Sequence, residues 1–364
     1  MFLPETIIIT TFIITALFLV KKGTTRKDVI IMNILLAIGL TTSAFFVLRQ
    51  ASIVSVFKIY FLYAALLFIY KYSERFHTTE RISVLAMLAG VFIVLSLNSD
   101  VALFISFALI LVSVYGFTVT RERPDMGAVT AVSTMLILLL MYKLAPAVVI
   151  MLAVLAVLTF PLKTRNSSLE ALVTTLVAPI LIFLCMKNLA TSKDPYFLVN
   201  SLRVVGSALV ILSPILLCSN KPTEKRMVKY GLFYVGNILF LLSMNTTGTF
   251  VLAVIYTLMI ALIYDAKLSS FSIFNLAMMP PSPAFIIKLL FLYELSTRSH
   301  PAYQMIMIIC SLAVMLHAAI DIYKIGVRRP LLLKIISITA IIVLLVYLEQ
   351  FKGILNAVIG VFAG

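Results

Sequence analysis

Continuous apolar runs of about 20 residues follow one another along nearly the whole chain, and only short polar connections separate them. Of the 364 residues, 62% are hydrophobic and 12% are charged, whereas a soluble domain has about 25% charged residues. Because the runs do not alternate apolar with polar residues, they predict membrane-spanning helices and not a β-barrel. The composition therefore excludes a soluble globular enzyme and a disordered chain, and the short connections leave no room for a catalytic domain outside the membrane.

Charge clusters and groups of Pro, Gly, Asn and Ser divide the sequence into about fourteen spans of about 20 residues. The expected fold is an all-α polytopic membrane protein. We expect helices 1 to 4 within residues 1–97 and a first set of repeated helices, with the start of a second, within 98–218. Residues 219–325 should complete the second set, and residues 326–364 should form a C-terminal helix and tail.

The basic residues are distributed unevenly between the two sides predicted by this span count. The chain has 29 Lys and Arg against 14 Asp and Glu. Nineteen of the basic residues fall in alternate connections, and six fall in the other connections and the tail. This alternation is what the positive-inside rule predicts, and it places both termini opposite the cytoplasm. The excess of positive charge then indicates contact with the lipid bilayer and not with nucleic acid.

The sequence contains no recognisable motif for a metal or a cofactor. Its three cysteines, Cys185, Cys218 and Cys310, lie in apolar runs without the short spacing of a ligand set, so we expect three small buried side chains. No phosphate-binding glycine loop and no nucleophile triad is present either. The sequence therefore predicts no cofactor, no metal and no catalytic residue.

The run from Phe271 to Glu294 is the most informative segment, because three prolines lie in its middle: Pro280, Pro281 and Pro283. Proline removes a backbone donor and clashes with the preceding helical turn. Such a break is tolerated at membrane depth only where protein or water covers the freed carbonyl groups. The prolines therefore predict a broken helix inside the membrane.

Lys288 follows Pro281 by seven residues, about two helical turns, so both lie on nearly the same face of the helix. A lysine at mid-bilayer is costly because burial disfavours its charged form, and such residues usually serve transport. Two simpler explanations are a side chain that extends to the membrane surface and a pair with Glu294. We favour a proton-carrying role for Lys288 on a proton pathway that includes Glu294.

His317 and Asp321 lie four residues apart and share one face of a predicted helix. The pair could relay protons along the same pathway. Alternatively, Asp321 lies near the cytoplasmic end of the helix and is paired there with Lys324. The sequence does not favour one of these two hypotheses over the other.

Two motifs resemble those of the antiporter-like membrane subunits of respiratory complex I. The first is Pro280-Pro281-x-x-x-Phe285-x-x-Lys288, which is similar to the broken twelfth helix of that family. The second begins with Lys225 and Arg226 and ends at Tyr230; it resembles the basic motif before the family's tenth helix, although an ordinary positive-inside anchor would also explain its basic residues. Three residues depart from the family's first pattern: Met278, Met279 and Ala284.

The resemblance is greatest to subunit N of bacterial NADH-quinone oxidoreductase and to its mitochondrial counterpart, subunit 2, and it extends from about residue 98 onward. It implies a fold of fourteen helices with two inverted five-helix repeats and broken helices near Pro161 and Pro280–Pro281. It also implies a chain of buried ionisable residues at the membrane midplane, which carries protons. The other subunits of a large membrane complex would then be the partners.

Several of the family's ionisable positions are apolar in this chain. A glutamate is replaced by Ile110, two lysines by Ala156 and Leu176, and a histidine by Val235, which leaves Lys288. A proton cannot cross an apolar core without titratable groups or water, because desolvating a bare charge is costly. We therefore expect that the N-terminal half of the proton pathway, its half-channel, does not conduct protons.

The resemblance implies a membrane-arm subunit of complex I that couples NADH:quinone electron transfer to proton translocation in a bacterial or mitochondrial inner membrane. Lys288 would be its surviving protonatable residue, or else a relic in a purely structural subunit. A related membrane-bound hydrogenase or cation–proton antiporter assembly is an alternative. A third is a stand-alone permease or lipid-linked-glycan flippase, which would need several cationic residues around one cavity.

Overall fold

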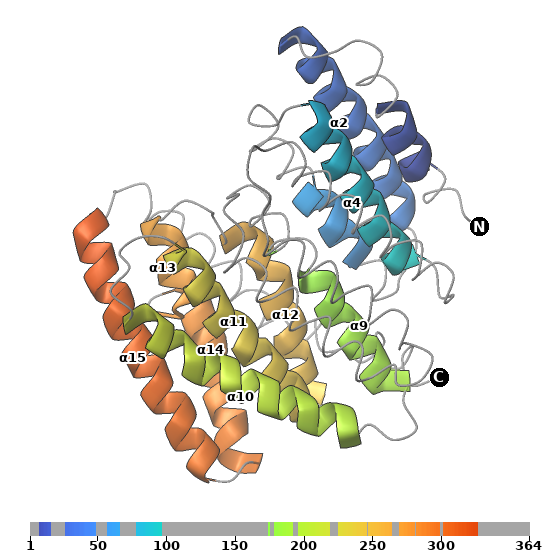
Figure 1. Ribbon diagram of the computed structural model, residues 1–364. Coiled ribbons are helices and arrows are strands. Elements are labelled where there is room, and N and C mark those ends of the chain that lie inside the picture. The colour runs from blue at the N-terminus through green and yellow to red at the C-terminus, as the bar shows by residue number, and fades with distance from the viewer. Residues whose placement is uncertain are drawn as a thin grey trace. The chain divides into compact units, whose positions relative to one another are not determined.

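The chain is helical wherever the computed structural model describes regular secondary structure (Figure 1). The described residues are 7–15, 26–48, 57–65, 78–96, 174, 178–191, 196–218, 225–245, 247–263, 269–280, 282–298 and 301–326. The all-α class is thus confirmed for this part of the chain. The expected spans between residues 98 and 162, the break near Pro161 and the final span after residue 330 lie outside it, so the count of fourteen helices stays a prediction.

The chain forms two compact units, Met1–Phe183 and Leu184–Gly364. The first unit contains α2 (Arg26–Leu48), α4 (Thr78–Ser96) and the beginning of α9 (Ala178–Thr191). Its core includes two aromatic pairs: the ring centroids of Phe61 and Phe92 are 5.5 Å apart, and those of Phe57 and Phe183 are 4.6 Å apart. These pairs bury large apolar surfaces between segments that are distant in the sequence.

The second unit is a bundle built around α11 (Figure 1). Every residue of α11 from Met227 to Ser243 is buried, so this helix has neighbours on all of its sides. The helices of the unit are α10 (Tyr196–Cys218), α11 (Arg226–Ser243), α12 (Thr247–Ile263), α13 (Ser270–Leu276), α14 (Pro283–Arg298) and α15 (Pro301–Ile325).

Two glycines allow α10 and α11 to approach closely. A Cβ atom on Gly206 of α10 would lie 2.7 Å from the backbone nitrogen of Phe240 and 2.9 Å from the carbonyl oxygen of Gly236, both in α11. Conversely, a Cβ atom on Gly236 would lie 3.1 Å from the carbonyl oxygen of Gly206. Small residues of this kind let helix backbones pack against each other, as is common between helices in membranes.

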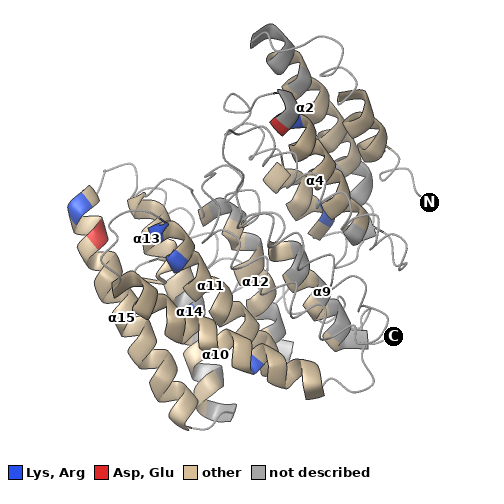
Figure 2. Ribbon diagram, in the orientation of Figure 1, with Lys and Arg blue, Asp and Glu red and all other residues tan. Residues whose placement is uncertain are grey.

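Among the described helices, α10 and α15 are long and apolar enough to cross a membrane. Both carry large apolar side chains that no other described residue covers; for example, Val204 is 69% exposed and Leu316 is 65% exposed. Figure 2 shows few charged residues along the described helices of the second unit; some of these lie at the start of α11 and at the end of α15. This distribution is typical of helices that lie in lipid.

The contact between α10 and α11 yields a first prediction. On an unconstrained helix, Gly→Ala would be stabilising by about 1 kcal/mol, but in Gly206→Ala the new methyl group meets backbone atoms that cannot move away. We expect this variant to lose about 1–3 kcal/mol of stability, seen as a lower unfolding temperature by circular dichroism in detergent. Val204→Leu, which enlarges an exposed side chain of the same helix, is the control. An unchanged or higher unfolding temperature for Gly206→Ala would contradict the close packing.

Candidate functional site

The proline-rich segment separates two helices in the structure: α13 ends at Leu276 and α14 begins at Pro283. The backbone leaves the regular helical pattern at Met278, whose φ of 52° lies in the left-handed region. Its N–H donates to the carbonyl of Asn275 over 3.0 Å, and the next N–H, that of Met279, donates to the carbonyl of Phe274. The i+4 donors for Leu276 and Ala277 would be prolines, so their carbonyl groups lose the normal helical bond.

Side chains from the break and from α12 stabilise the first turn of α14. Ser282 begins this turn, because its Oγ and its carbonyl oxygen both accept from the N–H of Phe285, over 3.2 and 3.0 Å. The hydroxyl of Tyr256 donates to the carbonyl oxygen of Ala284 over 3.2 Å and lies 3.7 Å from the sulfur of Met278. Tyr256 is fully buried, so its hydroxyl connects the two sides of the break inside the protein.

Lys288 lies one turn beyond Ala284 and points into the interior. Its side chain is only 1% exposed, and its Nζ donates a hydrogen bond to Oδ1 of Asn237 in α11. The nitrogen also lies 4.5 Å from the ring centroid of Phe291 and 5.6 Å from that of Phe233. Aromatic faces attract a cation, and the attraction is greater where water is absent. The described surroundings of Lys288 are thus an amide oxygen, two aromatic rings and the thiol of Cys310 in α15.

These contacts bear on the two simpler explanations for Lys288. The side chain does not extend to the surface of the described structure but ends at a buried amide. Within the described residues, no carboxylate pairs with it. Glu294 lies in the same helix, α14, but its side chain is outside the described part. The environment of Lys288 is therefore a neutral one as far as the structure describes it.

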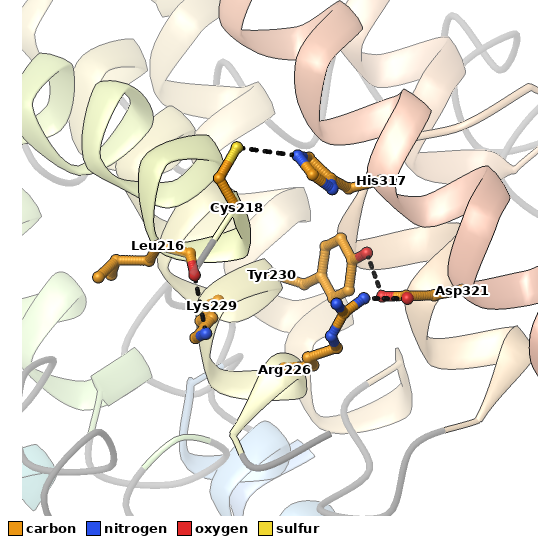
Figure 3. Close-up of polar contacts among 7 residues, drawn as sticks. All are labelled: Leu216, Cys218, Arg226, Lys229, Tyr230, His317 and Asp321. Carbon is orange, nitrogen blue, oxygen red and sulfur yellow. Dashed lines mark hydrogen bonds and ion pairs between the residues drawn. The ribbon is translucent and has the colours of Figure 1, made fainter. Parts of the chain in front are cut away.

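A second polar cluster joins the start of α11 to the end of α15 (Figure 3). Arg226 forms an ion pair with Asp321, and the hydroxyl of Tyr230 donates to the other carboxylate oxygen of Asp321 over 2.8 Å. Asp321 is thus bound from α11, rather than by Lys324, which is exposed. Two residues of the basic motif, Arg226 and Tyr230, therefore have a common partner that the sequence did not indicate.

The other residues of the basic motif shape the start of α11. Lys225 precedes the helix with a φ of 63°, and its carbonyl oxygen accepts from the backbone N–H of Lys229. The ammonium group of Lys229 donates to the carbonyl oxygen of Leu216 near the end of α10 over 2.8 Å (Figure 3). A cation at the C-terminal end of a helix is favourable, because free carbonyl groups gather there.

The two residues of the proposed α15 relay, His317 and Asp321, contact different partners. Nε2 of His317 lies 3.2 Å from the sulfur of Cys218, whereas Asp321 binds Arg226 and Tyr230 (Figure 3). The structure therefore brings His317 to the end of α10 and Asp321 to the start of α11. It places neither against Lys288.

The sequence analysis missed Asn237, which contacts Lys288, and Tyr256, which contacts both sides of the helix break. The signal for Asn237 was available, because it is a lone amide within an apolar run of α11. Tyr256 gave no such signal, since tyrosine is common in apolar helices. The searched residues contain no group of three or more His, Cys, Asp or Glu side chains that could hold a metal ion. A buried amine beside an amide oxygen is a group that can bind and release a proton.

Comparison with known proteins shows a similarity of fold to a chain of known structure. No protein-family model matches the sequence, and no curated protein sequence matches it. Among solved structures, the chain is similar to a chain of the Mrp complex from Dietzia sp. DQ12-45-1b, with a TM-score of 0.70 and 14% sequence identity. The match covers 89% of this chain and 80% of the Mrp chain. The two chains share a fold over most of their lengths.

The cluster around Asp321 yields a second prediction. The side chain of Asp321 is 4% exposed, so Arg226→Ala leaves a buried carboxylate without its cation, which costs about 3–5 kcal/mol. We expect the double variant Arg226→Ala/Asp321→Ala to unfold at a higher temperature than Arg226→Ala alone, because it removes the uncompensated charge. Thermal unfolding of the purified protein in detergent would measure both. A double variant less stable than the single one would show that the pair is not coupled as the structure places it.

Proposed function

We propose that the chain is an antiporter-like subunit of a multi-subunit membrane complex and that Lys288 carries protons in it. One observation carries the proposal: a fully buried lysine follows a helix break and has a neutral amide as its hydrogen-bond partner. Broken helices and buried ionisable residues are features of transport sites in membranes. A lysine paired with a carboxylate would be held in its charged form, whereas one beside an amide can lose its proton.

The fold and the motifs support the same proposal from independent directions. The chain of known structure that shares this fold is part of a multi-chain assembly, the Mrp complex. The two motifs, around Lys225 and around Lys288, resemble those of antiporter-like subunits and lie in the same order along the chain. The exposed apolar side chains of α10 and α15 fit a surface that meets lipid or other membrane subunits.

The complex to which the subunit belongs has two candidates. The first is complex I, where the chain would serve the coupling of NADH:quinone electron transfer to proton translocation in an inner membrane. The second is a cation–proton antiporter or hydrogenase assembly, which the fold shared with the Mrp chain favours. A stand-alone permease or flippase has less support, because Arg203 donates to the carbonyl oxygen of Ser243 instead of facing Lys288.

The lysine can act in proton transfer without any bound cofactor. Its ammonium form has three N–H donors, of which Asn237 accepts one, and the faces of Phe233 and Phe291 stabilise the positive charge. Releasing a proton leaves a neutral amine, which suits the apolar surroundings better. Loading and release from opposite sides of the membrane would move one proton across this subunit.

Replacement of Lys288 tests the proposal. In Lys288→Met the titratable group is lost while the length and apolar volume of the side chain are kept. We expect proton transport by the reconstituted complex, measured with a pH-sensitive dye in vesicles, to fall about 100-fold. Arg203→Gln, which removes a cation from α10, should transport like the unaltered protein.

The outcome separates transport from a purely structural role. Normal assembly with unchanged transport in Lys288→Met would mean that Lys288 is a relic and that the chain only supports its neighbours. Loss of transport with normal assembly would support the proposed role. Assembly is followed by the co-purification of the other subunits, so a misfolded variant is recognised.

Purification of the full chain in mild detergent distinguishes the candidate complexes. We expect other membrane subunits to co-purify with it, because the proposed function places the chain in a multi-subunit complex and the exposed apolar faces of α10 and α15 can receive a neighbouring subunit. Mass spectrometry of the preparation would identify an oxidoreductase with redox subunits, or an assembly without them. A chain that migrates alone, although it is folded, would contradict the proposal and favour a stand-alone permease.

A further inference from the structure

We infer that Asn237 is the positioning residue that allows Lys288 to exchange its proton, because its amide oxygen can accept a hydrogen bond from both the charged and the neutral lysine. This inference rests on the proposed function and assigns a role to a residue outside both sequence motifs. Asn237 lies in α11, opposite the first turns of α14, and is fully buried.

A second hydrogen bond fixes the orientation of the Asn237 amide. Its Nδ2 donates to the carbonyl oxygen of Phe233, one turn earlier in α11, over 2.7 Å. This bond turns Oδ1 toward Nζ of Lys288. The reversed amide would bring its N–H groups against the ammonium form of the lysine, which has no acceptor, and would place an oxygen against a carbonyl oxygen, so both contacts would become repulsive. The amide therefore presents an acceptor to the lysine.

A neutral acceptor suits a group that must change its charge. The ammonium form of lysine has three N–H donors, and the neutral amine keeps two, so one bond to Oδ1 can be kept in either state. A carboxylate at the same place would favour the ammonium strongly and oppose release. An apolar side chain would leave the buried N–H without an acceptor and would oppose loading.

The other groups around Lys288 leave this role to Asn237. From α15 the titratable group that interacts with Lys288 is the thiol of Cys310. From α12 the hydroxyl of Tyr256 is already bonded to the carbonyl oxygen of Ala284. The segment that forms α13, SFSIFNL, has no titratable side chain. The two cations of α11 have partners elsewhere: Arg226 pairs with Asp321, and Lys229 is bonded to the carbonyl oxygen of Leu216. On α14 itself the carboxylate is Glu294, six residues after Lys288.

The test is the pH dependence of proton transport by the assembled complex in vesicles. In Asn237→Leu the ammonium loses its acceptor, so Lys288 should release its proton at lower pH and the midpoint of the profile should move to lower pH by about one unit. In Asn237→Asp the added carboxylate stabilises the ammonium, so the midpoint should move to higher pH. Shifts of opposite sign are not expected from a general loss of stability.

The chain offers a matched control in Asn275 of α13. This residue is also a buried asparagine whose Nδ2 donates to the carbonyl oxygen of the residue four positions earlier, over 3.0 Å. The described hydrogen bond of Lys288 goes to Asn237 and not to Asn275. Asn275→Leu should leave the midpoint where it is in the unaltered complex.

A midpoint that is unchanged in Asn237→Leu, or that moves equally in Asn275→Leu, would overturn the inference. If Asn237→Asp does not assemble, the comparison of the two leucine variants decides. Transport by Lys288→Met at the normal rate would instead refute the proposed function itself. Loss of transport in Lys288→Met together with unshifted Asn237 variants would refute only the role of Asn237.

Discussion

The burial of every residue of α11 from Met227 to Ser243 is the constraint on which the second unit depends. Because no side of this helix is free, each residue type along it must suit a neighbour. Gly236 has no side chain where α10 crosses, Asn237 meets Lys288 of α14, and Arg226 meets Asp321 of α15. One helix thus determines the close packing of α10, the surroundings of the buried lysine and the ion pair at the end of the bundle.

The two polar sites of the bundle, at Asp321 and at Lys288, differ in the kind of groups that surround the charged side chain. At Asp321, a cation and a hydroxyl saturate the carboxylate, so the charges are compensated and the site holds α11 and α15 together. At Lys288, an amide and two aromatic rings support the charge without neutralising it. A compensated pair favours one fixed state, whereas a lysine without a carboxylate partner among the described residues can exist in two. This difference is why the proposed proton transfer is assigned to Lys288 and not to the cluster at Asp321.

The sequence predicted the features that arise from local chemistry. Prolines dictate a helix break wherever they occur, so the interruption between Leu276 and Pro283 could be expected from Pro280 and its neighbours. The long helix Tyr196–Cys218 likewise follows from an apolar run of the same extent. These properties depend only on residues that are adjacent along the chain.

The partners across the bundle could not be predicted in this way. A membrane helix is apolar around its whole circumference, so periodicity does not show which face meets which neighbour. Asn237 is unusual as a lone amide in an apolar run. Nothing in the sequence, however, connects it with Lys288, which lies fifty-one residues later. Asp321 was likewise assigned to Lys324 in one hypothesis because the two are close in the chain, whereas its partners come from a distant helix.

The enclosure of α11 also has a consequence for biogenesis. A helix that is buried from Met227 to Ser243, and that carries an arginine, a lysine and an asparagine, gains little from entering the bilayer by itself. During synthesis α11 would have to be held in the membrane by α10, which precedes it. The glycine of α10, Gly206, is the position where the backbone of α11 packs closely. Because α10 precedes α11 in the chain, it is synthesised before the helix that packs against it.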